Sequence, residues 1–315
     1  MSRSSPTTHA HRHTESLATA LLVLLTAIWG STFFLIHDLV TRVPPVDFLA
    51  ARFVVAAGVA AGVFHRQLRA LSRRDWALGA LLGGLYGGAQ ILQTMGLVHT
   101  DASVSGFVTG TYVVLTPVFL SAVLRERLPA STWYAVLLAT AGLAVLSLRG
   151  VAIGLGEALT LVAAALYAWH IIGLARWSSA ERAIGIAAVQ IIVIGAGCLV
   201  VASPGGLVLP EGPGQWVAVL YMAIVAGVGA LWIQTWSQAH MTATRAAIVM
   251  TLEPVFAALF AVGFGGESVT VRMLLGGGLI VAAMYTVELA GGRAGAPGGP
   301  RHSRAEHLGH DESQL

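Results

Sequence analysis

The sequence predicts an all-α polytopic membrane protein with ten transmembrane helices arranged as two inverted five-helix repeats. Its 315 residues are 56% hydrophobic and only 10% charged, which leaves too little polar surface for a soluble domain. Residues 91–103 (ILQTMGLVHTDAS) and 232–244 (WIQTWSQAHMTAT), 141 positions apart, share a Gln, a Thr, a His and an Ala in register. Each half also contains five apolar segments, and because five is odd, the halves should face opposite sides of the bilayer.

Ten apolar segments have the length of membrane spans, because a helix needs about 20 apolar residues to cross a hydrocarbon core of about 30 Å. The first half contains 17–36, 46–64, 76–97, 103–124 and 131–148. The second half contains 155–175, 183–202, 215–237, 243–263 and 271–290. The two repeats are therefore expected at 17–148 and 155–290. Residues 1–16 and 291–315 are rich in Ser, Thr, His, Gly and Pro, so we expect disordered cytoplasmic tails there.

The arginines predict that both termini lie in the cytoplasm. All 18 basic residues are Arg, and only Arg42, Arg149 and Arg272 fall on the side of the membrane opposite the termini. The segments on the terminal side hold Arg3, Arg12, Arg66, Arg69, Arg73, Arg74, Arg125, Arg127, Arg176, Arg182, Arg245, Arg293, Arg301 and Arg304. Positively charged loops remain in the cytoplasm. Because these arginines are spread over many short loops, they indicate no nucleic-acid partner.

The absence of lysine excludes several enzyme classes. A P-loop needs a Lys to reach the nucleotide phosphates, and Schiff-base chemistry needs a Lys amine. Ser105 and His170 could supply a nucleophile and a base, but no G-x-S-x-G or H-E-x-x-H motif accompanies them. We therefore expect neither enzyme activity nor a cofactor, and the expected partners are a small-molecule substrate and the lipid bilayer.

The histidines near the two ends raise the question of a metal site. A cluster of this kind could bind a transition metal, but a solvated low-complexity tail is the simpler interpretation, so we expect no metal. The residues concerned are His9, His11, His13, His302, His307 and His310.

Arg52 is the one arginine expected inside a span. Its guanidinium remains charged at any biological pH and needs an anionic or carbonyl partner. One interpretation is that Arg52 attracts a substrate carboxylate or phosphate into a cavity. The other is a structural role, in which Arg52 extends toward the membrane surface or caps helix carbonyls. The sequence leaves both open.

Glu253 lies about ten residues into the ninth expected span and is followed by Pro254. Proline removes a backbone N–H, so a bend or break is expected here. A carboxyl group beside a broken helix is a candidate proton or cation site and hence a coupling residue; alternatively, it is held neutral or pairs with Arg52. At the repeat offset Glu253 corresponds to Tyr112, which suggests that both line a shared central cavity.

Other polar residues within the expected spans complete a candidate substrate cavity, although interhelical hydrogen bonds would use the same residue types. Tyr86, Gln90 and Gln93 share one helix face, as do Ser105, Thr109, Tyr112 and Thr116. A lone midspan His such as His170 also suits simple packing. The complete candidate set is Trp29, Arg52, Tyr86, Gln90, Gln93, Tyr112, Tyr167, His170, Gln190, Trp232 and Gln234.

Four segments resemble a known family. WGSTFF at 29–34, the AARF segment containing Arg52, and the blocks at 102–128 and 243–267 resemble the two EamA repeats of the drug/metabolite transporter superfamily. The resemblance covers about residues 17–290. It implies ten helices with cytoplasmic termini, a central cavity between inverted halves, and export or exchange of small metabolites in a plasma membrane.

On this resemblance the expected protein is a secondary transporter of amino-acid-like or drug-like metabolites that works by alternating access. The alternative is a membrane sensor or assembly factor that binds a ligand without moving it. Pro117 and Pro254 are the expected hinges. Because Pro117 stands nine residues before Glu126 and Pro254 thirteen before Glu267, the two bends need not be symmetric.

Overall fold

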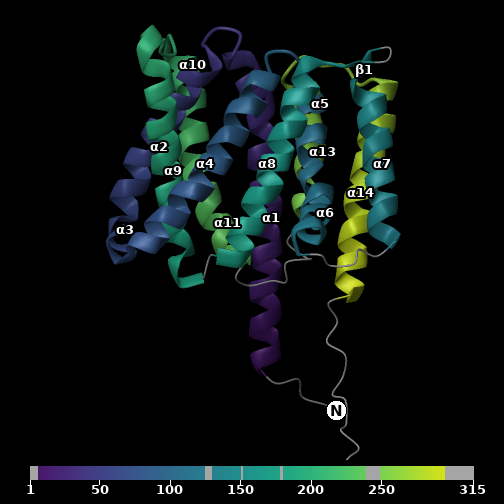
Figure 1. Ribbon diagram of the computed structural model, residues 1–315, viewed down its shortest axis with the longest axis horizontal. Coiled ribbons are helices and arrows are strands. Elements are labelled where there is room, and N and C mark those ends of the chain that lie inside the picture. The colour runs from purple at the N-terminus through teal and green to yellow at the C-terminus, as the bar shows by residue number, and fades with distance from the viewer. Residues whose placement is uncertain (1–5, 125–129, 150–151, 178–179, 239–248, 295–315) are drawn as a thin grey trace, which may run out of the picture.

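A computed structural model describes residues 6–124, 130–149, 152–177, 180–238 and 249–294 as a bundle of helices (Figure 1). The first half contains α1 (Pro6–Leu39), α2 (Pro45–Val63), α3 (His65–Ala70), α4 (Arg73–Gly96), α5 (Ala102–Gly110), α6 (Tyr112–Leu124) and α7 (Ala130–Ser147). The second half contains α8 (Leu155–Trp177), α9 (Ala180–Ala202), the 3-10 turn η1 (Ser203–Gly205), α10 (Pro213–Leu220), the π-helix η2 (Tyr221–Gly229), α11 (Ala230–Gln238), α13 (Glu253–Gly263) and α14 (Val271–Ala294).

Two short strands connect the halves and are an exception to the expected all-α fold. β1 (Leu148–Arg149) pairs antiparallel with β2 (Ala152–Ile153), with Leu148 opposite Ile153. The pair lies at the upper end of the bundle (Figure 1), where α7 passes to α8.

Helix α1 begins earlier than expected. The segment 6–16, predicted to be a disordered tail, is helical from Pro6 onward, because proline fits the first position of a helix, where no N–H is needed. At the other end α14 extends to Ala294, so the tail predicted from residue 291 is helical over its first residues. Residues 295–315 lie outside the described part of the chain.

Five helical segments are long and apolar enough to span a membrane by length and composition. They are Ser16–Leu39, Pro45–Val63, Leu155–Leu174, Glu181–Gly205 and Pro213–Gln234. Shorter apolar helices occur at Ala102–Thr116, Trp133–Val145, Glu253–Gly263 and Val271–Thr286. The chain is thus a multi-pass membrane protein, and the number of ten spans remains a prediction.

The helices of the two halves contact each other in exchanged pairs. If α1, α2 and α7 correspond to α8, α9 and α14, the contacts α2–α9 and α7–α14 each join corresponding helices. The contacts of α4 with α8 and α9 likewise have counterparts in those of η2 with α1 and α2, and α1–α13 has one in α8–α5. Helices α1 and α8 run in opposite directions along the bundle (Figure 1).

Both halves contain the same helix interruption at repeat-related positions. In the first half Thr111 separates α5 from α6, and its N–H donates to the Val108 carbonyl over 3.1 Å. In the second half Leu252 precedes α13, and its N–H donates to the Val249 carbonyl, also over 3.1 Å. The two donors are 141 residues apart, and so are the two acceptors, so the bends are symmetric in the repeat.

The two interruptions have different local causes. In the first half the Thr111 hydroxyl donates to the Val108 carbonyl over 2.6 Å, where a side chain competes with regular helix hydrogen bonding. In the second half Pro254, in the first turn of α13, supplies no N–H. Pro117, the expected hinge of the first half, lies within α6, and the chain is interrupted at Thr111 instead.

Candidate functional site

Arg52 lies in α2 with only 4% of its surface exposed. Its Nη1 donates to Gln90 Oε1 over 3.4 Å, whereas its Nε is buried without a hydrogen-bond partner. The guanidinium carbon lies 5.0 Å from the centre of the Phe53 ring. Within the described ranges no carboxylate forms an ion pair with Arg52, so the pairing with Glu253 considered from the sequence is absent. A buried positive charge is therefore left without a counter-ion.

A chain of hydrogen bonds extends from Gln90 across the boundary between the halves. Gln90 Nε2 donates to the Tyr167 hydroxyl over 2.6 Å and to the Tyr86 hydroxyl over 3.3 Å. Tyr167, on α8, donates to Gln93 Oε1 over 3.0 Å. Gln93 Nε2 then donates to the Thr109 hydroxyl on α5 over 2.8 Å. The shared face of Tyr86, Gln90 and Gln93 on α4 is thus directed toward both halves.

Tyr112 and Glu253 lie against each other at the two helix interruptions. The Tyr112 hydroxyl donates to Glu253 Oε2 over 3.3 Å, and the two residues are 141 positions apart, which is the repeat offset. Tyr112 is the first residue of α6 and Glu253 the first of α13. Glu253 is 9% exposed, and it interacts electrostatically with Tyr86 and Tyr167. This carboxyl group therefore adjoins the polar chain of α4 and α8.

His170 and Gln190 form a second buried pair beside the chain. His170 Nε2 donates to Gln190 Oε1 over 2.6 Å, and the His170 ring centre lies 5.1 Å from that of Tyr86. Tyr86 also meets the Tyr167 ring edge-on, with the centres 5.5 Å apart. The pair links α8 to α9 and supports the Tyr86 ring.

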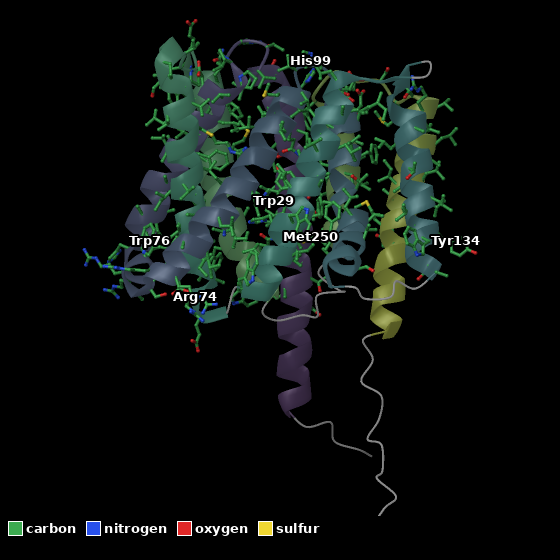
Figure 2. All side chains as sticks on the ribbon, viewed as in Figure 1. Trp29, Arg74, Trp76, His99, Tyr134 and Met250 are labelled. Carbon is green, nitrogen blue, oxygen red and sulfur yellow. The ribbon has the colours of Figure 1, made fainter. Side chains whose placement is uncertain are left out.

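The tryptophans predicted for the cavity occupy two different environments. Trp29 donates from Nε1 to the Ala226 carbonyl of η2 over 3.1 Å, and two residues on, Ser31 bonds the Tyr221 hydroxyl over 2.7 Å. Figure 2 places Trp29 at mid-height in the bundle, between Arg74 at one end and His99 at the other. Trp232, in contrast, is 51% exposed.

Trp232 and Gln234 are not brought into the polar cluster. Neither has a hydrogen bond, and Gln234 is only partly buried, on a helix that contacts mainly α1 and η2. The sequence repeat relates Gln234 to Gln93 but does not fix which face of the helix each presents. The η2 segment gains residues per turn relative to an α-helix, which changes that face.

Three carboxylates at the upper end of the bundle join the halves, and the sequence interpretation missed them as site residues. Asp47 Oδ2 accepts from the Val208 N–H over 3.1 Å, and Glu157 Oε1 accepts from the Thr100 hydroxyl over 3.0 Å. Glu267 accepts from the Ser103 hydroxyl and, over 3.3 Å, from the Ser103 N–H. Their partners lie 57 to 164 residues away in the chain, so no local pattern could identify them.

A pocket of about 340 Å³ lies where the end of α1 meets the start of α10, with Asp38, Arg42 and Glu211 in its lining. None of the cavity residues predicted from the sequence lines it. The buried polar cluster and this surface pocket are therefore separate features.

The chain has similarity to known proteins over nearly its whole length. It matches the EamA-like transporter family over residues 17–148 and 154–289. It is 28% identical over 272 residues to an uncharacterized transporter of Archaeoglobus fulgidus, a match that covers 85% of this chain and 84% of that relative. A solved crystal structure of a protein shares 22% identity and a TM-score of 0.61, covering 89% of this chain and 99% of that chain. At this identity the solved structure supports the fold alone.

Proposed function

Because the chain belongs to the EamA-like transporter family, a family of membrane transporters, we propose that it is a secondary transporter of the plasma membrane. It exports or exchanges small metabolites by alternating access. Its substrate site is the polar cluster around Arg52, Gln90, Tyr167 and Glu253, and both termini lie in the cytoplasm.

The observation that carries the proposal is a buried cation and a buried carboxyl group among apolar helices without an ion pair between them. Arg52 is 4% exposed and Glu253 is 9% exposed. Burying such groups costs several kcal/mol each, and packing alone would favour apolar side chains at both positions. A site that binds polar cargo between the halves accounts for retaining them.

The arrangement of the halves supports the alternating-access part of the proposal. Corresponding helices contact each other in exchanged pairs, and the central helices are interrupted at repeat-related positions. In inverted-repeat transporters, one half rocks against the other around a site at such interruptions.

Counterflow into vesicles tests the function. Purified protein is reconstituted into liposomes loaded with unlabelled amino acid, and uptake of the same labelled amino acid is followed for a panel of amino acids. We expect labelled substrate to accumulate transiently for at least one compound, above empty liposomes. Binding of a compound without any exchange would contradict transport and indicate the sensor alternative.

A further inference from the structure

The hydrogen-bond directions around Gln90 are fixed by Arg52. A guanidinium only donates hydrogen bonds, so the Gln90 atom that faces Arg52 is the carbonyl oxygen, 3.4 Å from Nη1. The Gln90 amide nitrogen therefore faces the tyrosines, and its two hydrogens go to Tyr86 and Tyr167. Both tyrosine oxygens act as acceptors toward Gln90.

The two tyrosines then differ in what their own hydroxyl hydrogen can do. Tyr167 passes its hydrogen to Gln93 Oε1 over 3.0 Å. Gln93 in turn uses its amide nitrogen toward Thr109. Tyr86 has no hydrogen bond in which it donates, within the residues that the structure describes. Its hydroxyl hydrogen is therefore available to an acceptor that the protein does not supply.

Arg52 presents a second unused donor beside the same glutamine. Its Nε is buried and has no partner, and Arg52 interacts electrostatically with the Tyr86 and Tyr167 hydroxyls. Every acceptor on the Gln90 and Gln93 amides is occupied by a protein donor. The group is thus rich in donors and positively charged, and it lacks an oxygen acceptor.

We propose that Arg52 Nε and the Tyr86 hydroxyl form a subsite for a substrate carboxylate. This proposal rests on the transport function proposed above and adds the substrate class. A carboxylate supplies two acceptor oxygens and the missing negative charge, and charge-assisted hydrogen bonds are the strong ones. A dianionic phosphate offers the same atoms, but Glu253 interacts electrostatically with Tyr86, and its carboxyl group disfavours a second negative charge on the ligand.

The test measures binding separately from transport. Acetate, glycine and L-phenylalanine, the corresponding amides of each, and inorganic phosphate are added to the full chain in detergent. Thermal stabilisation is titrated, because a ligand that binds only the folded state raises the unfolding temperature. We expect at least one carboxylate to stabilise the wild type more than its own amide does and more than phosphate does.

Three substitutions assign the effect to the subsite. Tyr86→Phe removes one donor and keeps the ring, so carboxylate affinity should fall about tenfold or more, as for a lost hydrogen bond to a charged group. Arg52→Gln should weaken it further, and Arg52→Lys should restore part of the loss because the charge is kept without the fork. Tyr134→Phe, at a 66% exposed position seen at the edge of the bundle in Figure 2, is the matched control and should leave affinity unchanged.

Several results would overturn the carboxylate subsite. They are equal stabilisation by a carboxylate and its amide, stronger stabilisation by phosphate, no stabilisation by any carboxylate, or unchanged carboxylate affinity in Tyr86→Phe. Tyr86→Phe decides the outcome even where Arg52→Gln fails to fold. If carboxylates bind in this pattern but no counterflow occurs, the transport function fails and the subsite stands. If counterflow occurs equally for amides, the subsite fails and transport stands.

Discussion

Tyr112 and Glu253 are repeat-related residues that contact each other, at 3.3 Å between the hydroxyl and Oε2. Two positions related by an approximate twofold axis can touch only where both lie close to that axis. Each residue also begins a helix after an interruption, and the partial positive charge of a helix N-terminus favours a carboxylate there. A proton or cation bound at Glu253 would therefore be sensed by both halves at once.

We predict that Glu253→Gln separates coupling from transport. The amide imitates the permanently protonated carboxyl group, and a proton drives a conformational change only through different affinities in two states. Accumulation driven by a proton gradient should be lost, while substrate counterflow stays within about twofold of wild type. Vesicles with and without an imposed pH gradient provide the measurement. Proton-driven accumulation at the wild-type rate in Glu253→Gln would make Glu253 a packing residue.

At the scale of elements, the two interrupted helices are packed directly against each other by a glycine. A Cβ at Gly106 of α5 would lie 2.5 Å from the Ala257 Cβ of α13, much closer than two carbon atoms approach. The contact therefore depends on the missing side chain, as is common where helices meet closely in membranes. The same helices carry Thr109, Tyr112 and Glu253, so this spacing positions the polar cluster.

We predict opposite effects for two Gly→Ala substitutions. Gly106→Ala should destabilise the protein by about 1–3 kcal/mol through overpacking. Gly84→Ala on α4, where a Cβ meets nothing within 4 Å, should be neutral or stabilise by up to about 1 kcal/mol. Unfolding in detergent followed by circular dichroism compares the two. A Gly106→Ala protein as stable as Gly84→Ala would contradict the close α5–α13 contact.

The first turn of α4 connects the halves through a charged residue outside the membrane span. Ser72 and Asp75 form a capping box, and Arg182 of α9 donates to Asp75 Oδ1 over 2.9 Å. The hydrogen bonds from Ser72, followed by the Arg182 charge, lower the pKa of Asp75. A carboxyl group with a lowered pKa in the folded state stabilises the fold above its unfolded pKa, near 4, and loses that effect as the pH falls through the folded pKa.

We predict that Asp75→Asn has a lower unfolding temperature than wild type at pH 7. The difference should shrink at pH 3 and below, because wild-type Asp75 then approaches its neutral form. Thermal unfolding in detergent over this range gives the comparison, with Asp38→Asn, an exposed carboxylate on α1, as the control. A difference that is the same at pH 7 and pH 2 would mean that the charge of Asp75 does not stabilise the fold.

At the scale of the whole molecule, the lower end of the bundle holds both helix ends nearest the termini. The start of α1 and the end of α14 lie at that end in Figure 1. Arg74 lies at the same end in Figure 2, as the positive-inside rule requires for a cytoplasmic face. The opposite end carries the three carboxylate contacts of Asp47, Glu157 and Glu267 that join the halves.

We predict that reporter fusions after residues 70 and 300 both give cytoplasmic signals, because 14 arginines fall on the inner side and 3 on the outer. Paired reporters that are active on only one side of the membrane provide the measurement. A fusion after residue 42, at the opposite end of α1, is the control and should give an external signal. An external signal after residue 70 or 300 would refute the orientation.

The sequence by itself determined the membrane class, the family and the twofold repeat, because these depend on composition and on order along the chain. It also placed Tyr86, Gln90 and Gln93 on one helix face, since residues three and four apart on a helix share a side. The break at Glu253 could be read from Pro254 for the same local reason. The matching break at Thr111 could not, because its cause is a hydroxyl that replaces a proline.

Only the tertiary structure decided which of the polar residues meet. It left Arg52 without a carboxylate, placed Tyr112 against Glu253, and excluded Trp232 and Gln234 from the polar cluster. It also supplied partners from the other half for Asp47, Glu157 and Glu267. A hydrogen bond is made over about 3 Å, whereas these partners are separated by dozens to more than a hundred residues, so their pairing depends on how the helices pack.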